Sequence, residues 1–102
     1  MNYYEAYELK DKYIPSALYT IIEITQKGKK FNPVHDELIN KTAYPLYLKE
    51  GERGYVCVDT DKDGCYHLLY TSSIEKATPW EMEPAEVTIE TKNTVYTLKR
   101  IG

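Results

Sequence analysis

Residues 85–101, AEVTIETKNTVYTLKRI, alternate apolar and polar side chains on both sides of a short polar turn. Successive side chains of a β-strand point to opposite faces, so this period of two predicts two antiparallel strands that turn at Lys92 and Asn93. The face expected to be dry carries Val87, Ile89, Tyr96 and Leu98. The face expected to be wet carries Thr88, Glu90, Thr97 and Lys99. One dry and one wet face are typical of an antiparallel sheet that packs on one side.

Two further segments favour strands. Residues 17–26, ALYTIIEITQ, place one set of side chains on each face: Leu18, Thr20, Ile22 and Ile24 on the first, and Tyr19, Ile21, Glu23 and Thr25 on the second. Residues 42–50, TAYPLYLKE, predict a strand in which Pro45 marks an edge or a bulge, because proline has no N–H to donate. Residues 72–84, SSIEKATPWEMEP, predict an irregular connection that Trp80 anchors to the body of the fold.

The motif DTDKDG, residues 59–64, raises the question of a calcium loop, because such loops begin with acidic residues at alternate positions and a glycine. A twelve-residue loop from Asp59 ends at Tyr70, where a calcium site needs a bidentate Glu. The flanking segments, GYVCV and CYHLLYT, are typical of strands. The motif therefore predicts a hairpin that turns at Asp63 and Gly64, with Cys57 opposite Tyr70.

The two cysteines, Cys57 and Cys65, fall on opposite faces of this hairpin, which argues against a disulfide between them. Free thiols favour a reduced, cytoplasmic location. Together with His35 and His67 they supply nucleophiles and soft metal ligands, but neither a Cys-x-x-Cys nor a His-x-x-x-His pair occurs, and no glycine-rich phosphate loop is present. We therefore expect no enzymatic activity, no metal site and no cofactor.

Two segments favour short helices. Asn2 and Glu5 form a capping-box pattern, after which Tyr3 and Tyr7 would share a helical face, and an extended arm is the alternative. Residues 32–41, NPVHDELINK, predict a helix that begins at Asn32 and Pro33. The side chains expected to cover the core from this helix are Val34, Leu38 and Ile39.

The 102 residues suffice for one domain, residues 1–102, with a single core. We expect a mainly β fold, a small antiparallel barrel of about five or six strands of the SH3-like kind, with one or two short helices. Residues 1–15 would form a helix or an arm, and residues 16–102 the barrel. No apolar run reaches the length of about 18 residues that a membrane span needs, and the first residues do not resemble a secretory signal.

A formal net charge of −3 argues against general nucleic-acid binding, which needs a basic surface. The unusual component is tyrosine, with 11 residues against one Phe and one Trp. Tyrosine suits half-buried strands, and it also supplies rigid contact area on binding surfaces.

Both faces of the central hairpin are apolar. One carries Val56, Val58 and Leu69, and the other carries Tyr55, Cys57, Leu68 and Tyr70. We expect the core to cover one face and a helix, a second copy or a partner to cover the other, although the pattern does not tell which is which. Because Tyr and Arg most often dominate binding energy, the predicted binding surface consists of Arg53, Tyr55, Tyr66 and Tyr70.

The segments HLLYTSSI and VTIETKNTVYTL resemble the closing strands of short, mostly uncharacterised β-proteins of bacteria, their phages and mobile elements. The resemblance covers roughly residues 51–98 and depends on turn and strand residues: His67, Thr71, Ser72, Thr91, Asn93 and Tyr96. It implies an accessory protein that binds and blocks a host protein, for example a defence protein. The alternative is a small-molecule binder that sequesters a nucleotide signal, with Tyr rings stacked on a base and Arg53 or Lys on phosphate.

Overall fold

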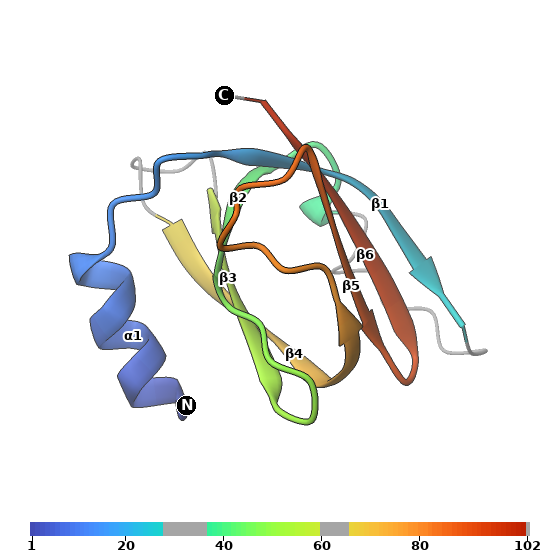
Figure 1. Cartoon of the computed structure of the whole chain (residues 1–102), viewed down its shortest axis with the longest axis horizontal. Helices are drawn as coiled ribbons and strands as arrows, with labels where there is room; N and C mark the ends of the chain where they lie inside the picture. The colour runs from blue at the N-terminus through green and yellow to red at the C-terminus, as the bar shows by residue number, and fades with distance from the viewer. Residues whose placement is uncertain (28–36, 60–65, 102) are drawn as a thin grey trace.

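A computed structural model describes residues 1–27, 37–59 and 66–101, with only the backbone of Tyr66. It shows a closed barrel of six antiparallel strands with one short helix packed on the outside (Figure 1). The elements in chain order are α1 (Tyr3–Lys12), β1 (Tyr19–Gln26), β2 (Thr42–Tyr47), β3 (Arg53–Asp59), β4 (Tyr66–Ala77), β5 (Glu86–Thr91) and β6 (Thr94–Arg100). The expected small antiparallel β-barrel is thus confirmed, in its six-stranded form.

The strands form a simple meander, in which each pairs with the next and β1 pairs with β6 to close the barrel. The β5–β6 hairpin has the predicted register, since Thr88 lies opposite Thr97 and the turn falls at residues 92–93. Its expected dry face is the buried one, with Val87, Ile89, Tyr96 and Leu98 all inside the barrel.

The barrel interior is a single apolar cluster to which every strand contributes, including Tyr19, Ile21, Ala43, Val56, Val58, Ile74, Ile89 and Leu98. Leu38 and Ile39, just before β2, pack against this cluster as predicted. Val34 and the start of the predicted helix lie outside the described residues. Trp80 also packs on the cluster, which confirms that it anchors the connection between β4 and β5.

The strict alternation predicted for residues 17–26 is wrong in the second half of β1. A β-bulge interrupts the pairing with β6, where Ile21 lies opposite Leu98 and Glu23 opposite Thr97. The extra residue, Ile22, shifts the pattern by one position, because a bulge sets two residues against one. Ile24 therefore packs on the same core as Ile21, and Ile22 is exposed.

The irregular connection predicted from residue 72 onward begins later than expected, because β4 continues to Ala77. A second bulge lies on β4 between Tyr70 and Ser73, where two residues face Gly54 of β3. There the Thr71 hydroxyl accepts a 2.9 Å hydrogen bond from the Gly54 N–H, so the polar side chain is satisfied inside the barrel. The bulge bends β4 and lets its second half pair with β5.

The predicted bulge at Pro45 is confirmed, since the register of β2 against β3 shifts between Pro45 and Tyr47. Proline removes one ladder donor, and β2 pairs with β1 only before this point, through Thr42 and Ala43.

The central hairpin has a different register from the one predicted. Cys57 lies opposite Leu68 rather than Tyr70, a shift of two residues, and Asp59 lies opposite Tyr66. Side chains alternate with a period of two, so the shift leaves the predicted faces unchanged. Asp61, Asp63, Gly64 and Cys65 lie outside the described residues, so the turn and the calcium question stay predictions.

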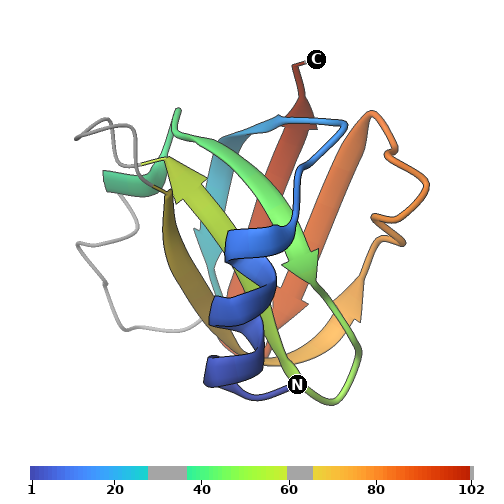
Figure 2. The same cartoon turned by 90° about the vertical axis from the view of Figure 1, so that its left-hand side faces the viewer.

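The first segment is a helix rather than an arm. Asn2 caps it through the predicted capping box, in which its side chain accepts from the Glu5 N–H and the Glu5 carboxylate accepts from the Asn2 N–H. Seen from its own side, α1 lies across the outside of the barrel over β2 and β3 (Figure 2). Within the described ranges, no helix has the length and apolar character needed to cross a membrane.

Candidate functional site

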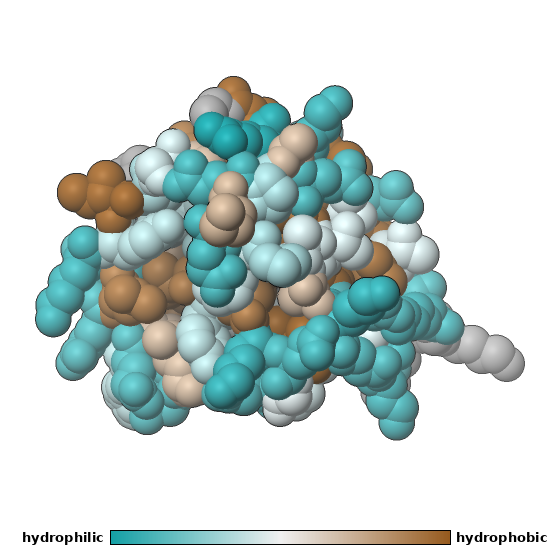
Figure 3. Space-filling model, viewed as in Figure 1, coloured by the Kyte–Doolittle hydropathy of each residue, from teal (hydrophilic) through white to brown (hydrophobic). Residues whose placement is uncertain are grey.

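The outer face of the central hairpin forms a second hydrophobic cluster under α1. Its buried members are Ala6, Tyr44, Leu46, Tyr55 and Cys57, with Leu9 and Leu68 packed at the margin. Hydrophobic surface remains visible where α1 meets the barrel (Figure 3). The face that we expected a helix, a second copy or a partner to cover is thus covered, at least in part, by the chain's own helix.

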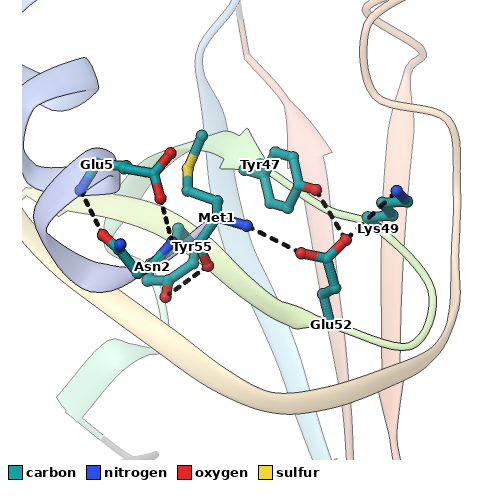
Figure 4. Close-up of polar contacts among 7 residues, drawn as sticks. All are labelled: Met1, Asn2, Glu5, Tyr47, Lys49, Glu52 and Tyr55. Carbon is teal, nitrogen blue, oxygen red and sulfur yellow. Dashed lines mark hydrogen bonds and ion pairs between the residues drawn. The ribbon is translucent and has the colours of Figure 1, made fainter.

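Polar contacts fix the N-terminal end of α1 to the β2–β3 connection (Figure 4). The α-ammonium of Met1 lies 2.9 Å from Glu52 Oε1, and the Tyr47 hydroxyl donates to Glu52 Oε2 at 3.0 Å. The hydrogen bond from the ammonium, followed by that from Tyr47, lowers the pKa of Glu52 to about 2. The Tyr55 hydroxyl also donates to the Met1 carbonyl at 3.4 Å. These contacts set where the exposed side chains of α1 lie relative to β3 and β4.

Three exposed tyrosine rings form a continuous row from β4 onto α1. The Tyr70 ring lies 5.9 Å from the Tyr3 ring in an edge-on arrangement, and the Tyr3 ring lies 6.2 Å from the Tyr7 ring. Their exposed fractions are 50%, 46% and 48%, respectively. Tyr4, 81% exposed, adds a fourth ring 6.3 Å from Tyr3. Edge-on and tilted pairs at these distances are favourable, so the rings hold one another in place.

A cation lies over the ring at each end of this row. The Arg53 guanidinium is 5.2 Å from the Tyr70 ring centre, and the Lys10 ammonium is 4.7 Å from that of Tyr7. Both distances fall within the range of cation–π attraction. We call the set Tyr3, Tyr4, Tyr7, Tyr70 and Arg53 the tyrosine surface.

The structure brings together two of the four residues predicted for the binding surface. Arg53 and Tyr70 are in contact and exposed. Tyr55 lies next to them, with its ring 6.5 Å from that of Tyr70, but it is only 4% exposed because α1 covers it. The backbone of Tyr66 lies opposite Asp59 at the start of β4, and its side chain is not among the described groups.

Sequence reasoning missed the contribution of α1. The capping box placed Tyr3 and Tyr7 on one helical face, but nothing in the sequence indicated that this face would lie beside Tyr70. The sequence did contain one signal for this contact, the apolar outer face of the hairpin, which had to be covered by another element. Residues 3–12, the helical segment predicted at the N-terminus, could have been assigned to cover it.

The thiol and imidazole candidates do not form a reactive pair in the described residues. Cys57 is fully buried in the outer cluster, and burial raises its thiol pKa, with the Tyr44 hydrogen bond and the Lys10 charge partly opposing this. His67 is exposed at the start of β4, opposite Val58. His35 and Cys65 lie outside the described part of the chain.

Comparison with known proteins places this chain in no group: no family model matches it, and neither a curated protein nor a solved structure is detectably similar. Functional inference therefore depends on the surface itself.

Proposed function

We propose that this chain is a non-enzymatic binding protein whose tyrosine surface docks onto a protein partner. The observation that carries the proposal is the row of three half-exposed tyrosine rings with an arginine stacked at its end. Tyr and Arg are the residue types most often found at binding hot spots. Ring–ring contacts already restrict these side chains, so little conformational entropy is lost when a partner covers them.

The form of the surface favours a macromolecule over a small ligand. Small-molecule sites usually enclose most of their ligand within a concavity. The tyrosine surface instead lies on the outside of the barrel, and the Tyr3 and Tyr70 rings meet at 81°, so they do not form parallel walls for a base. A nucleotide-binding role is therefore the less favoured proposal.

We also propose a biological role for this interaction. The resemblance of residues 51–98 to short β-proteins of bacteria, phages and mobile elements suggests that the partner is a host protein, such as a defence protein, and that binding blocks it in the cytoplasm. This part depends on the resemblance alone, whereas the docking surface depends on geometry.

Capture and sedimentation experiments test the docking surface. The double variant Tyr7→Ala and Tyr70→Thr removes two rings while favouring helix and strand, respectively. The control is Ile22→Thr, an exposed residue of β1, which runs away from α1 (Figure 1). We expect wild type and control to retain the same host protein, or to self-associate equally, and the double variant to lose the interaction. Equal retention by all three would contradict the proposal.

A thermal-shift panel of linear and cyclic nucleotides tests the less favoured role. A ligand that binds only the folded state raises its melting temperature. We expect no shift, and a shift abolished by the double variant would replace the protein-docking proposal with a nucleotide-binding one.

A further inference from the structure

The two arginines of the chain differ in what they bind. The Arg100 Nη1 donates a 2.9 Å hydrogen bond to the Glu83 carbonyl, which holds the β4–β5 connection against β6. Arg53 is exposed and lies within cation–π distance of Tyr70, and within the described ranges its guanidinium has no ion pair and no hydrogen bond. The adjacent carboxylate, Glu52, is already paired with Met1 and Tyr47. Arg53 therefore has hydrogen-bond donors that the described structure does not use.

A guanidinium held over one aromatic ring can still direct its N–H groups toward a partner outside the protein. The five N–H groups lie in the guanidinium plane, in a fork that matches the two oxygens of a carboxylate. The Tyr70 ring restricts the rotamers of Arg53 and shields it from water on one side, and both effects favour a charge-assisted pair. An arginine in this setting is suited to receive an anion from outside.

We propose that Arg53 binds a carboxylate of an extended, acidic segment of the partner, while apolar side chains of the same segment pack across Tyr70, Tyr3 and Tyr7. This inference depends on the proposed function and names the chemistry of its partner. The acidic side chain lies at the Arg53 end of the row, and the apolar ones lie toward α1.

The spacing of the rings fits an extended segment. Neighbouring ring centres are 5.9 Å and 6.2 Å apart. Alternate side chains of an extended chain lie about 6.6 Å apart, because the rise is about 3.3 Å per residue. Side chains at every second position of the segment would thus each meet one ring.

A carboxylate fits this position better than a phosphate. Phosphate groups carry about −1.5 to −2 charges and are usually met by clusters of arginines. Arg53 is the one arginine at the tyrosine surface, and the adjacent helix carries the exposed acidic residues Glu5 and Glu8. A single negative charge is therefore the better match.

Selection from a random 12-residue peptide display library tests the inference with defined probes. The full chain is the bait, and the double variant Tyr7→Ala and Tyr70→Thr serves to remove peptides that bind elsewhere. We expect the remaining peptides to be enriched in an Asp or Glu at one end of a run with apolar residues at alternate positions. For one synthesised peptide, Arg53→Gln and replacement of its carboxylate by an amide should each weaken binding about tenfold, and together no further.

The outcomes separate the two proposals. Peptides that need the rings but carry no acidic residue would overturn the role of Arg53. A carboxylate whose loss still weakens binding to the Arg53→Gln variant would do the same. Neither result would contradict binding at the tyrosine surface. Failure to obtain any ring-dependent peptide would overturn this inference, and the capture experiment with host protein then decides the proposed function separately.

Discussion

Gly54 lies in the barrel wall where neighbouring side chains leave no room for a Cβ. A Cβ at this residue would lie 2.7 Å from Ile74 Cδ1 and 3.0 Å from Leu48 Cδ2, inside normal contact. We expect Gly54→Val to lower the free energy of unfolding by about 1–3 kcal/mol, since overpacking forces neighbours out of place. Urea denaturation measures the change. Gly51, with φ +86° and no atom within 4 Å of the place a Cβ would take, offers a contrast: Gly51→Asn adds no crowding and should cost only backbone strain of about 1 kcal/mol. Equal stability of wild type and Gly54→Val would contradict this packing.

The free energy of unfolding should depend on pH through the carboxylate of Glu52. Its pKa falls from 4.5 to about 2 on folding, chiefly through the hydrogen bond from the Met1 ammonium. A lowered pKa stabilises the fold above the unfolded value, and the contribution disappears as pH drops from about 4.5 toward about 2. We expect wild type to exceed Glu52→Gln in unfolding free energy at pH 7, with the gap closing by pH 2, in protein with nothing added before Met1.

The matched control for this titration is Glu81→Gln, an exposed residue of the β4–β5 connection that makes no ion pair in the described structure. The unfolding free energy of the Glu81→Gln variant should equal that of wild type at pH 7 and at pH 2. A Glu52→Gln gap that stays constant from pH 7 to pH 2 would show that the ion pair with Met1 does not form in solution.

At the scale of elements, the β1 bulge separates two isoleucines that strict alternation places together. Ile24 packs on the core and Ile22 is exposed. We expect Ile24→Ala to cost at least about 1 kcal/mol more than Ile22→Ala, because the first change removes more buried apolar area and takes it from the core. Denaturation midpoints of the two variants provide the measurement, and equal costs would mean that the bulge is absent.

The docking of α1 is testable through Cys57, which is fully buried beneath it. In a Cys65→Ser background, thiol labelling reports how often the helix leaves the barrel. Ala6→Asp places a charge at a fully buried helical position and should raise the labelling rate about tenfold or more. Tyr4→Ser, at an exposed position, should leave the rate unchanged. Rapid labelling of the folded parent protein would contradict stable docking.

Period-two patterns predicted the faces of both hairpins but the register of only the β5–β6 hairpin. The faces of the β5–β6 hairpin and of the central hairpin follow from local alternation, and the structure confirms both. The register of the central hairpin was wrong by two residues, because a two-residue shift preserves every face and the sequence offers no penalty against it. The bulges at Ile22 of β1 and at residues 71–72 of β4 also escaped prediction, since they depend on closing the barrel.

Across the whole molecule, two of the four residues predicted for the binding surface, Arg53 and Tyr70, are exposed and in contact, and both belong to the central hairpin. Arg53 and Tyr70 meet across neighbouring strands because Tyr70 lies opposite Tyr55, whereas the predicted register placed Tyr70 opposite Cys57, four residues from Arg53. The contact between Tyr3 and Tyr70 joins residues far apart in the chain, and only the docking of α1 creates it. The same docking buries Tyr55, so its predicted exposure could not be judged from the hairpin alone.

Calorimetric titration with the purified captured partner measures whether the tyrosine surface binds it. Relative to wild type, Tyr7→Ala with Tyr70→Thr should weaken binding at least about tenfold, because two hot-spot rings are lost. The Ile22→Thr control should bind as wild type does. A double variant that stays folded by circular dichroism and binds with wild-type affinity would contradict the account.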